Sequence, residues 1–216
     1  MATTGVRRGR AGGPTRQAQQ SVGFAGTLRY SIADDARKKQ PPVSEAFHLL
    51  GVGGSGMMPL ALLLAEAGHR VSGADRSFDR DPADERIAAL AAHGVTLLPQ
   101  DAAAPPGATV VVSTAIEPDH PALAGARTVR HRSEALADLV AAAGARRRVL
   151  VAGSSGKTTT TAMVGWILDR LGLDPLVYVG GEVPGMAPRG ARAGAGPLVI
   201  EVDESDGSIA RFAPDV

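Results

Sequence analysis

The chain has 216 residues, of which 44% are hydrophobic and 3% are aromatic, and its formal net charge at pH 7 is +1. This length allows one large domain or two small ones, and the absence of cysteine excludes disulfides, thiolate metal sites and a cysteine nucleophile. The longest apolar runs are too short to span a membrane, and the N-terminus lacks the apolar stretch of a secretory signal. We therefore expect a cytoplasmic protein without a membrane partner.

Residues 1–44 are predicted to form a disordered basic tail. The first 40 residues contain eight Lys or Arg and two Asp, a net charge of +6, and they show no apolar period. A nucleic-acid-binding arm and an organelle transit peptide are the alternative interpretations. Because no second basic patch supports contact with RNA or DNA, no nucleic-acid partner is expected.

Residues 45–144 have the pattern of a Rossmann-like domain. Apolar segments predict strands at 47–50, 70–75, 95–98 and 108–113, with a further edge strand at 127–130. Helices are predicted at 57–69, 82–94, 120–126 and 132–144. Strands that alternate with helices indicate an α/β fold with a doubly wound parallel sheet.

Residues 145–216 predict a second α/β unit, a truncated ATP-binding domain of the P-loop type. Its strands are expected at 149–153, 175–181 and 197–202, and its helix at 158–172. Three strands and one helix leave one face of the sheet uncovered, which is unusual for a parallel sheet. The second unit is therefore expected to be incomplete.

The stretch "GVGGSG" at residues 51–56 fits the pattern G-x-G-x-x-G between a strand and a helix. Asp75 ends the next strand, near the position of a ribose-binding acid in NAD enzymes. The pattern requires only a diphosphate at a helix N-terminus, so a UDP-sugar fits as well as NAD does. A tight turn without a ligand is the third interpretation.

A second glycine loop, "GSSGKTT" at residues 153–159, also lies between a strand and a helix. Lys157 is predicted to reach the terminal phosphates of a nucleotide, and the Thr158 hydroxyl to bind Mg²⁺. The loop is shorter than the standard P-loop, and an ordinary glycine turn is the alternative. The predicted ATP-binding residues are Gly153, Ser154, Ser155, Gly156, Lys157, Thr158 and Thr159.

Four carboxylates lie at or just after the end of the strand at 197–202, namely Glu201, Asp203, Glu204 and Asp206. Ligands of open α/β sheets gather beyond the carboxyl ends of the strands, where the second glycine loop is also expected. One of these carboxylates is therefore predicted to bind the Mg²⁺ of ATP. A solvated acidic turn is the alternative.

Four stretches, "FHLLGVGGSGMM", "VVSTAIEPDHPAL", "GSSGKTTTT" and "EVDESDGS", occur in an order and spacing that resemble the Mur ligases. The resemblance covers residues 47–216. It implies an ATP-dependent amide ligase of peptidoglycan precursor synthesis that joins L-alanine to UDP-N-acetylmuramate through an acyl phosphate, with ATP and Mg²⁺.

The resemblance also assigns residues. It implies Lys157, Thr158 and Glu204 as catalytic residues, with Thr158 and Glu204 on the metal and with Asp203 or Glu201 as alternatives to Glu204. Ser113, Thr114 and Ala115 match a loop on the substrate side, and His131 and Arg132 lie near another. The implied UDP-sugar-binding residues are Gly51, Gly53, Gly54, Ser55, Gly56, Met57, Asp75, Ser113 and Thr114.

Two departures from the family pattern bear on activity. Ser154 and Ser155 replace the usual Thr and His, and the rest of the ATPase domain and the domain that binds the amino acid are not among these 216 residues. The chain is therefore expected to be inactive alone, and a non-catalytic UDP-sugar-binding module is the alternative. An NAD-dependent oxidoreductase leaves the second glycine loop unexplained.

Overall fold

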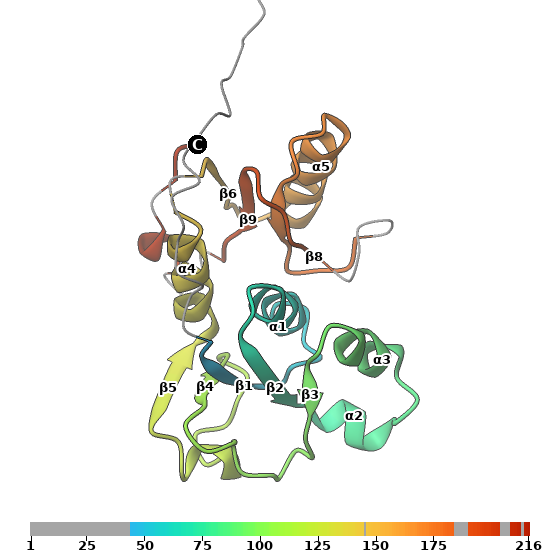
Figure 1. The fold of residues 1–216 in the computed structure, drawn as a ribbon, viewed down its shortest axis with the longest axis vertical. Helices are drawn as coiled ribbons and strands as arrows, with labels where there is room; N and C mark the ends of the chain where they lie inside the picture. Colours follow the sequence, from blue (N-terminus) through green and yellow to red (C-terminus); the bar gives the residue numbers. More distant parts are fainter. Residues whose placement is uncertain (1–43, 145, 184–189, 204–207, 213) are drawn as a thin grey trace, which may run out of the picture. The chain divides into compact units, whose positions relative to one another are not determined.

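The computed structural model describes residues 44–144, 146–183, 190–203, 208–212 and 214–216, and Figure 1 shows their arrangement. The basic tail predicted for residues 1–44 lies outside them except for Ser44. None of the helices in the described part of the chain has the length and apolar character that crossing a bilayer requires.

The first sheet is parallel throughout, as predicted. Its strands are β1 (Ala46–Leu50), β2 (Arg70–Ala74), β3 (Thr96–Leu97), β4 (Thr109–Val112) and β5 (Thr128–His131). They lie in the order β3-β2-β1-β4-β5. The direction of winding reverses between β1 and β4, and open α/β sheets bind ligands in the crevice at such a point.

Four α-helices accompany this sheet: α1 (Met57–Glu66), α2 (Arg76–Arg80), α3 (Glu85–Ala92) and α4 (Arg132–Ala142). The helix predicted at 82–94 is shorter than expected, because the Asp84 side chain caps its N-terminus and Gly94 takes a left-handed backbone with φ of +77°. The helix predicted at 120–126 is wrong. Only a 3₁₀ turn, η1 (Pro121–Leu123), forms there, since so short a segment makes few helical hydrogen bonds.

The second sheet has four strands where the sequence predicted three. They are β6 (Arg148–Val151), β7 (Leu176–Tyr178), β8 (Ala191–Arg192) and β9 (Leu198–Glu201), in the order β6-β9-β7-β8. The additional strand β8 is antiparallel to β7. The helix α5 (Lys157–Arg170) follows β6, and a 3₁₀ turn, η2 (Ser208–Arg211), follows β9.

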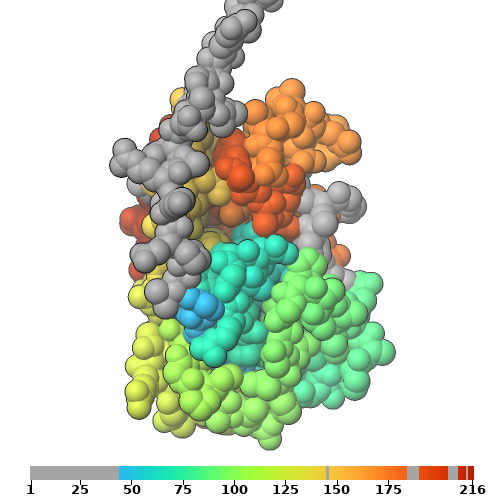
Figure 2. All heavy atoms as spheres, in the orientation of Figure 1, coloured from blue at the N-terminus to red at the C-terminus, as the bar shows by residue number. Residues whose placement is uncertain are grey.

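Both faces of the second sheet are packed, so the prediction of an uncovered face is wrong. On one face, Val177 and Val199 pack with Val164 of α5. On the other face, Leu198 and Ile200 belong to the hydrophobic cluster that also contains the buried leucines of α1. Figure 2 shows the teal atoms of α1 next to the orange-red atoms of the second sheet. A helix from the first α/β unit therefore covers the face that the second unit's own helix does not.

Candidate nucleotide-binding site

The first glycine loop, residues 51–56, connects β1 to α1 at the reversal point of the first sheet. The amide of Gly54 donates to the Gly51 carbonyl at 2.9 Å, and the amides of Met57 and Met58 donate to the Gly54 carbonyl. Among the described residues, the amides of Ser55 and Gly56 have no acceptor, and no side chain caps α1. These two amides at a helix N-terminus are therefore placed to bind an anion.

A cavity of about 320 Å³, which we call the glycine-loop cavity, lies against this loop. From the loop it is lined by the predicted residues Gly51, Gly54, Ser55, Gly56 and Met57. From other segments it is lined by the predicted residues Asp75, Ser113, Thr114 and Ala115. The structure thus brings together segments that are more than 50 residues apart in the sequence, in a volume at the lower end of those typical of ligand pockets.

Gly53 is the one predicted loop residue that does not line the glycine-loop cavity. Its amide donates to Oδ2 of Asp75 at 2.9 Å, and its carbonyl accepts from Nη1 of Arg86 at 2.8 Å. The other oxygen of Asp75 accepts from Ser77 and caps α2. A hydrogen bond to Asp84 raises the pKa of Arg86. The chain's own side chains therefore fix the Gly53 peptide and shape the loop.

The second glycine loop, residues 153–156, connects β6 to α5. Gly156 caps α5 with a left-handed backbone, φ +76°, which side chains rarely tolerate. Among the described residues, the amides of Gly153, Ser154, Ser155 and Gly156 have no acceptor. Ser154, Ser155 and the predicted Thr159 are exposed. A row of open amides at the start of a 14-residue helix is the arrangement that binds phosphate.

Glu201 is in direct contact with the first turn of α5. Val151 at the end of β6 pairs with Glu201 at the end of the neighbouring strand β9. The Thr158 hydroxyl donates to Oε1 of Glu201 at 3.0 Å, and the Gly180 amide donates to Oε2 at 2.9 Å. Glu204, the metal ligand that the sequence favours, lies outside the described residues. Glu201, one of its alternatives, is a carboxylate that contacts Thr158.

Arg132 lies between the two glycine loops. Its Nη2 is 3.4 Å from Oδ2 of Asp203, just beyond the end of β9. On the other side its guanidinium lies against Gly56, where a Cβ atom would collide with it. The preceding residue, His131, caps α4: its Nδ1 accepts from the Ser133 amide at 3.3 Å. The structure thus gives His131 a helix-capping contact and places Arg132 beside both loops.

Tyr178 was not predicted from the sequence as a site residue. Its hydroxyl donates to the Gly56 carbonyl at 2.9 Å across 122 positions of the chain. The residue is a buried aromatic in a strand, and a sequence pattern of this kind predicts only core packing. A buried tyrosine hydroxyl needs a polar partner, and that requirement is the only signal that could have marked it.

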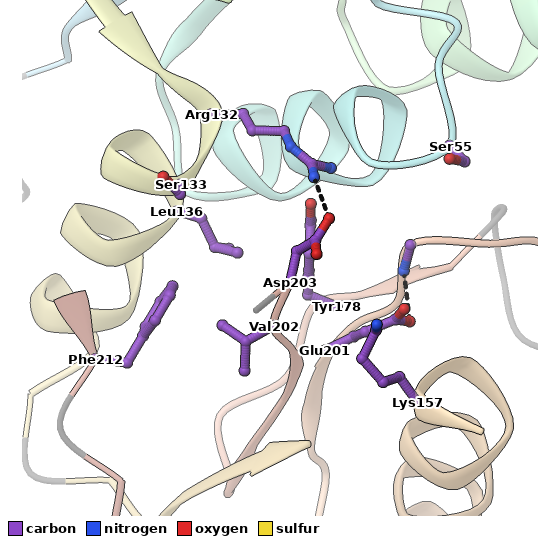
Figure 3. A pocket seen from close by; sticks show the side chains of 11 residues that line it. Ser55, Arg132, Ser133, Leu136, Lys157, Tyr178, Glu201, Val202, Asp203 and Phe212 are labelled. Carbon is purple, nitrogen blue, oxygen red and sulfur yellow. Dashed lines mark hydrogen bonds and ion pairs between the residues drawn. The ribbon is translucent and has the colours of Figure 1, made fainter. Parts of the chain in front are cut away.

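A second cavity of about 160 Å³, which we call the junction cavity, lies between the loops. Ser55 and Arg132 line it from one side, and Lys157, Tyr178, Glu201 and Asp203 line it from the other, as Figure 3 shows. Ser55 and Arg132 also line the glycine-loop cavity. The two cavities therefore adjoin at these residues, and the junction cavity is lined by residues next to both glycine loops.

The described residues contain no cluster of three or more His, Asp or Glu that could hold a metal ion by itself. Thr158 and Glu201 offer hard oxygen atoms 3.0 Å apart. Mg²⁺ usually takes one or two protein oxygens and completes its coordination with water and substrate phosphates. Thr158 and Glu201 therefore fit a nucleotide-bound Mg²⁺.

The family described as "Mur ligase family, catalytic domain" matches residues 46–148. A UDP-N-acetylmuramate–L-alanine ligase from Kineococcus radiotolerans is 45% identical over 177 residues, which are 78% of this chain. The chain belongs to the Mur ligase family. The sequence interpretation of both the family and the α/β fold is therefore confirmed.

Solved structures of Mur ligases share the fold. The UDP-N-acetylmuramate-alanine ligase of Thermotoga maritima superimposes with a TM-score of 0.70 at 30% identity, over 79% of this chain and 40% of that chain. A UDP-N-acetylmuramate:L-alanyl-γ-D-glutamyl-meso-diaminopimelate ligase from Neisseria meningitides gives a TM-score of 0.61 at 25% identity, over 73% and 52% of the two chains. This chain matches only 36% of the Kineococcus enzyme's length. Mur ligases that act on different substrates thus share this part of the fold.

Proposed function

We propose that this chain forms the nucleotide-binding part of an ATP-dependent Mur ligase that joins L-alanine to UDP-N-acetylmuramate. The observation that carries the proposal is the junction cavity, because residues from both glycine loops, Ser55 and Lys157, line it. Two helix N-termini that face one cavity can hold two different phosphate groups next to each other. A transfer between two nucleotide-linked substrates requires that arrangement.

Residues 45–144 bind the uridine diphosphate part of the acceptor substrate in this proposal. The amides of Ser55 and Gly56 hold the diphosphate, and Ser113 and Thr114 line the same cavity farther along. Asp75, which also lines this cavity, already braces Gly53 and caps α2, so its contact with a ribose would add to these bonds.

Residues 145–216 bind ATP through the second glycine loop. The amides of residues 153–156 surround a phosphate, Lys157 holds the terminal phosphates, and the Thr158 hydroxyl and Glu201 hold Mg²⁺. The ion would supply positive charge to the phosphate oxygens as the transferred group departs. The Glu201 carboxylate is oriented for this by the Gly180 amide.

The proposed reaction has two steps. A carboxylate oxygen of UDP-N-acetylmuramate attacks the γ-phosphorus, ADP leaves, and an acyl phosphate forms. The amine of L-alanine then attacks the acyl carbon, phosphate leaves, and an amide results after loss of a proton. In the first step Lys157 stabilises the negative charge on the transferred phosphoryl group, and the two loops hold the reacting groups close together.

The test of this proposal joins the chain to the part of the Kineococcus ligase that lies beyond the match, and measures phosphate release. Release that requires ATP, UDP-N-acetylmuramate and L-alanine together, and that is lost in Lys157→Ala, supports the proposal. Full release in Lys157→Ala contradicts it.

Calorimetry on the 216-residue chain is an independent test. The chain should bind UDP-N-acetylmuramate, and titration with NADH should give no heat of binding. Binding without turnover in the fusion would support the non-catalytic alternative.

A further inference from the structure

Arg132 occupies the point where the two nucleotide sites meet. It is the first residue of α4, and it lines both the glycine-loop cavity and the junction cavity. We propose that Arg132 binds the carboxylate of the acceptor substrate and that Asp203 holds the guanidinium when this carboxylate is absent. This inference rests on the proposed function and adds to it the residue that recognises the acid group of the substrate.

The position of the reacting carboxylate follows from the two loops. The substrate's diphosphate lies at the first glycine loop, and the γ-phosphate lies at Lys157 in the second. The acid group must reach the γ-phosphate, so it must enter the junction cavity between them. At about 160 Å³ this cavity is too small for a whole nucleotide, but it has room for the two reacting groups.

The charges around the junction cavity make a cation necessary. Glu201 and Asp203 line it, and a carboxylate that enters beside them is repelled. Among the described residues that line this cavity, the cations are Lys157 and Arg132. Lys157 is assigned to the phosphates of ATP. Arg132 is therefore the group that can bind the substrate's carboxylate.

The contact between Arg132 and Asp203 is long enough for a substrate carboxylate to replace Asp203 on the guanidinium. The Nη2 to Oδ2 distance of 3.4 Å exceeds the ~2.7–2.9 Å of strong charge-assisted hydrogen bonds. An arginine fork binds a carboxylate best through two parallel hydrogen bonds. A substrate carboxylate that makes both hydrogen bonds therefore binds Arg132 more strongly than Asp203 does through its single long contact. Figure 3 shows the guanidinium and Asp203 facing each other inside the cavity.

The experiment compares two ligands that differ by the lactyl ether group, which bears this carboxylate. UDP-N-acetylmuramate carries it, whereas UDP-N-acetylglucosamine has the same uridine diphosphate and amino sugar without it. Calorimetry on the 216-residue chain should show at least about tenfold tighter binding of UDP-N-acetylmuramate, as one charge-assisted contact provides. Arg132→Met should abolish this preference and leave the affinity for UDP-N-acetylglucosamine unchanged, which also shows that the variant is folded.

Two further variants sharpen the test. Asp203→Asn removes the competing carboxylate, so the preference for UDP-N-acetylmuramate should rise several-fold. Arg130→Met removes a half-exposed arginine that pairs with Asp138 and lines neither cavity, so the preference should not change.

Each other outcome overturns the inference in a recognisable way. If Arg132→Met weakens both ligands by the same factor, Arg132 binds the diphosphate and not the carboxylate. If the preference survives in Arg132→Met, another residue recognises the acid group. If neither ligand binds the unmodified chain, the proposed function itself fails at the first glycine loop, and this inference fails with it.

Discussion

The Thr158 hydroxyl donates a 3.0 Å hydrogen bond to Oε1 of Glu201, across the gap between the start of α5 and the end of β9. The pairing of β6 with β9 fixes this relationship, because Val151 and Glu201 are partners in the register of the sheet. It places one hydroxyl and one carboxylate beside the open amides of the second glycine loop. A nucleotide-bound Mg²⁺ needs such a pair of oxygen atoms.

Glu201→Gln should weaken Mg²⁺-dependent binding of a non-hydrolysable ATP analogue. The variant keeps the hydrogen bond with Thr158 but loses the charge that faces the ion, so the affinity should fall about 10- to 100-fold, as expected for a contact of ~1.5–3 kcal/mol to a charged group. Calorimetry with and without Mg²⁺ measures this. Glu66→Gln, a change at the far end of α1, is the matched control. A larger loss in Glu204→Gln than in Glu201→Gln would assign the metal to Glu204 instead.

Lys157→Ala should separate the two nucleotide sites. The ATP analogue should bind on the order of 100-fold more weakly, because a charge-assisted contact to the phosphates is lost, while the affinity for UDP-N-acetylmuramate should stay within twofold, roughly the error of such a comparison. Arg170→Ala, at the opposite end of the same helix, serves as the control. Equal losses for both ligands would show that the two sites are not independent.

Gly56→Ala should impair the first glycine loop while it changes the stability of the fold little. The new Cβ would collide with the Arg132 guanidinium and press on the Tyr178 hydroxyl, and the flexible end of the arginine side chain can move away, so the change should displace Arg132 from the loop at little cost in folding free energy. Urea denaturation measures the free energy of unfolding, and titration with UDP measures the loop. Gly125→Ala has no atoms near the added methyl group and should change neither quantity. Unchanged UDP binding in a folded Gly56→Ala protein would count against the role of this loop.

The buried His48 should make stability depend on pH. Burial, together with the nearby His120, lowers its pKa from 6.5 to about 4. In the unfolded chain the imidazole of His48 is protonated below pH 6.5, whereas in the folded protein it stays neutral down to about pH 4. The free energy of unfolding therefore falls as the pH drops through this range. The loss is about 1.4 kcal/mol per pH unit for one group.

The measurement is urea denaturation at pH 7.5 and pH 5.0. The free energy of unfolding should fall by about 2 kcal/mol more in the unmodified chain than in His48→Gln, since only the former has this titrating group. His69→Gln, at an intermediate-exposure site, is the control. The same pH dependence in His48→Gln as in the unmodified chain would contradict the assignment to His48.

The strands and helices on either side of the two glycine loops could be predicted from the sequence. Each loop follows an apolar run typical of a buried strand, and a helix begins directly after its last glycine. The sequence placed Gly51, Gly54, Ser55 and Gly56 at one site and residues 153–158 at another. These are local patterns, and local patterns determine where helices begin and which amides are left open.

The sequence could not predict contacts that depend on packing between distant segments. Arg132 and Asp203 are 71 positions apart, and Tyr178 lies 122 positions from Gly56. For the same reason the covering of the second sheet by α1 was missed, since the pattern of residues 145–216 contains no information about a helix from elsewhere. The helix predicted at 120–126 was wrong because so short a segment makes too few helical hydrogen bonds, and only a 3₁₀ turn forms there.

The central claim is that the two helix N-termini hold two different nucleotides at the same time on opposite sides of the junction cavity. The most direct measurement is calorimetric titration of the 216-residue chain, first with UDP-N-acetylmuramate and then, at saturation, with the ATP analogue and Mg²⁺. The account predicts that each ligand binds once and that bound UDP-N-acetylmuramate does not prevent the ATP analogue from binding. Competition between them, or failure of either to bind, would contradict it.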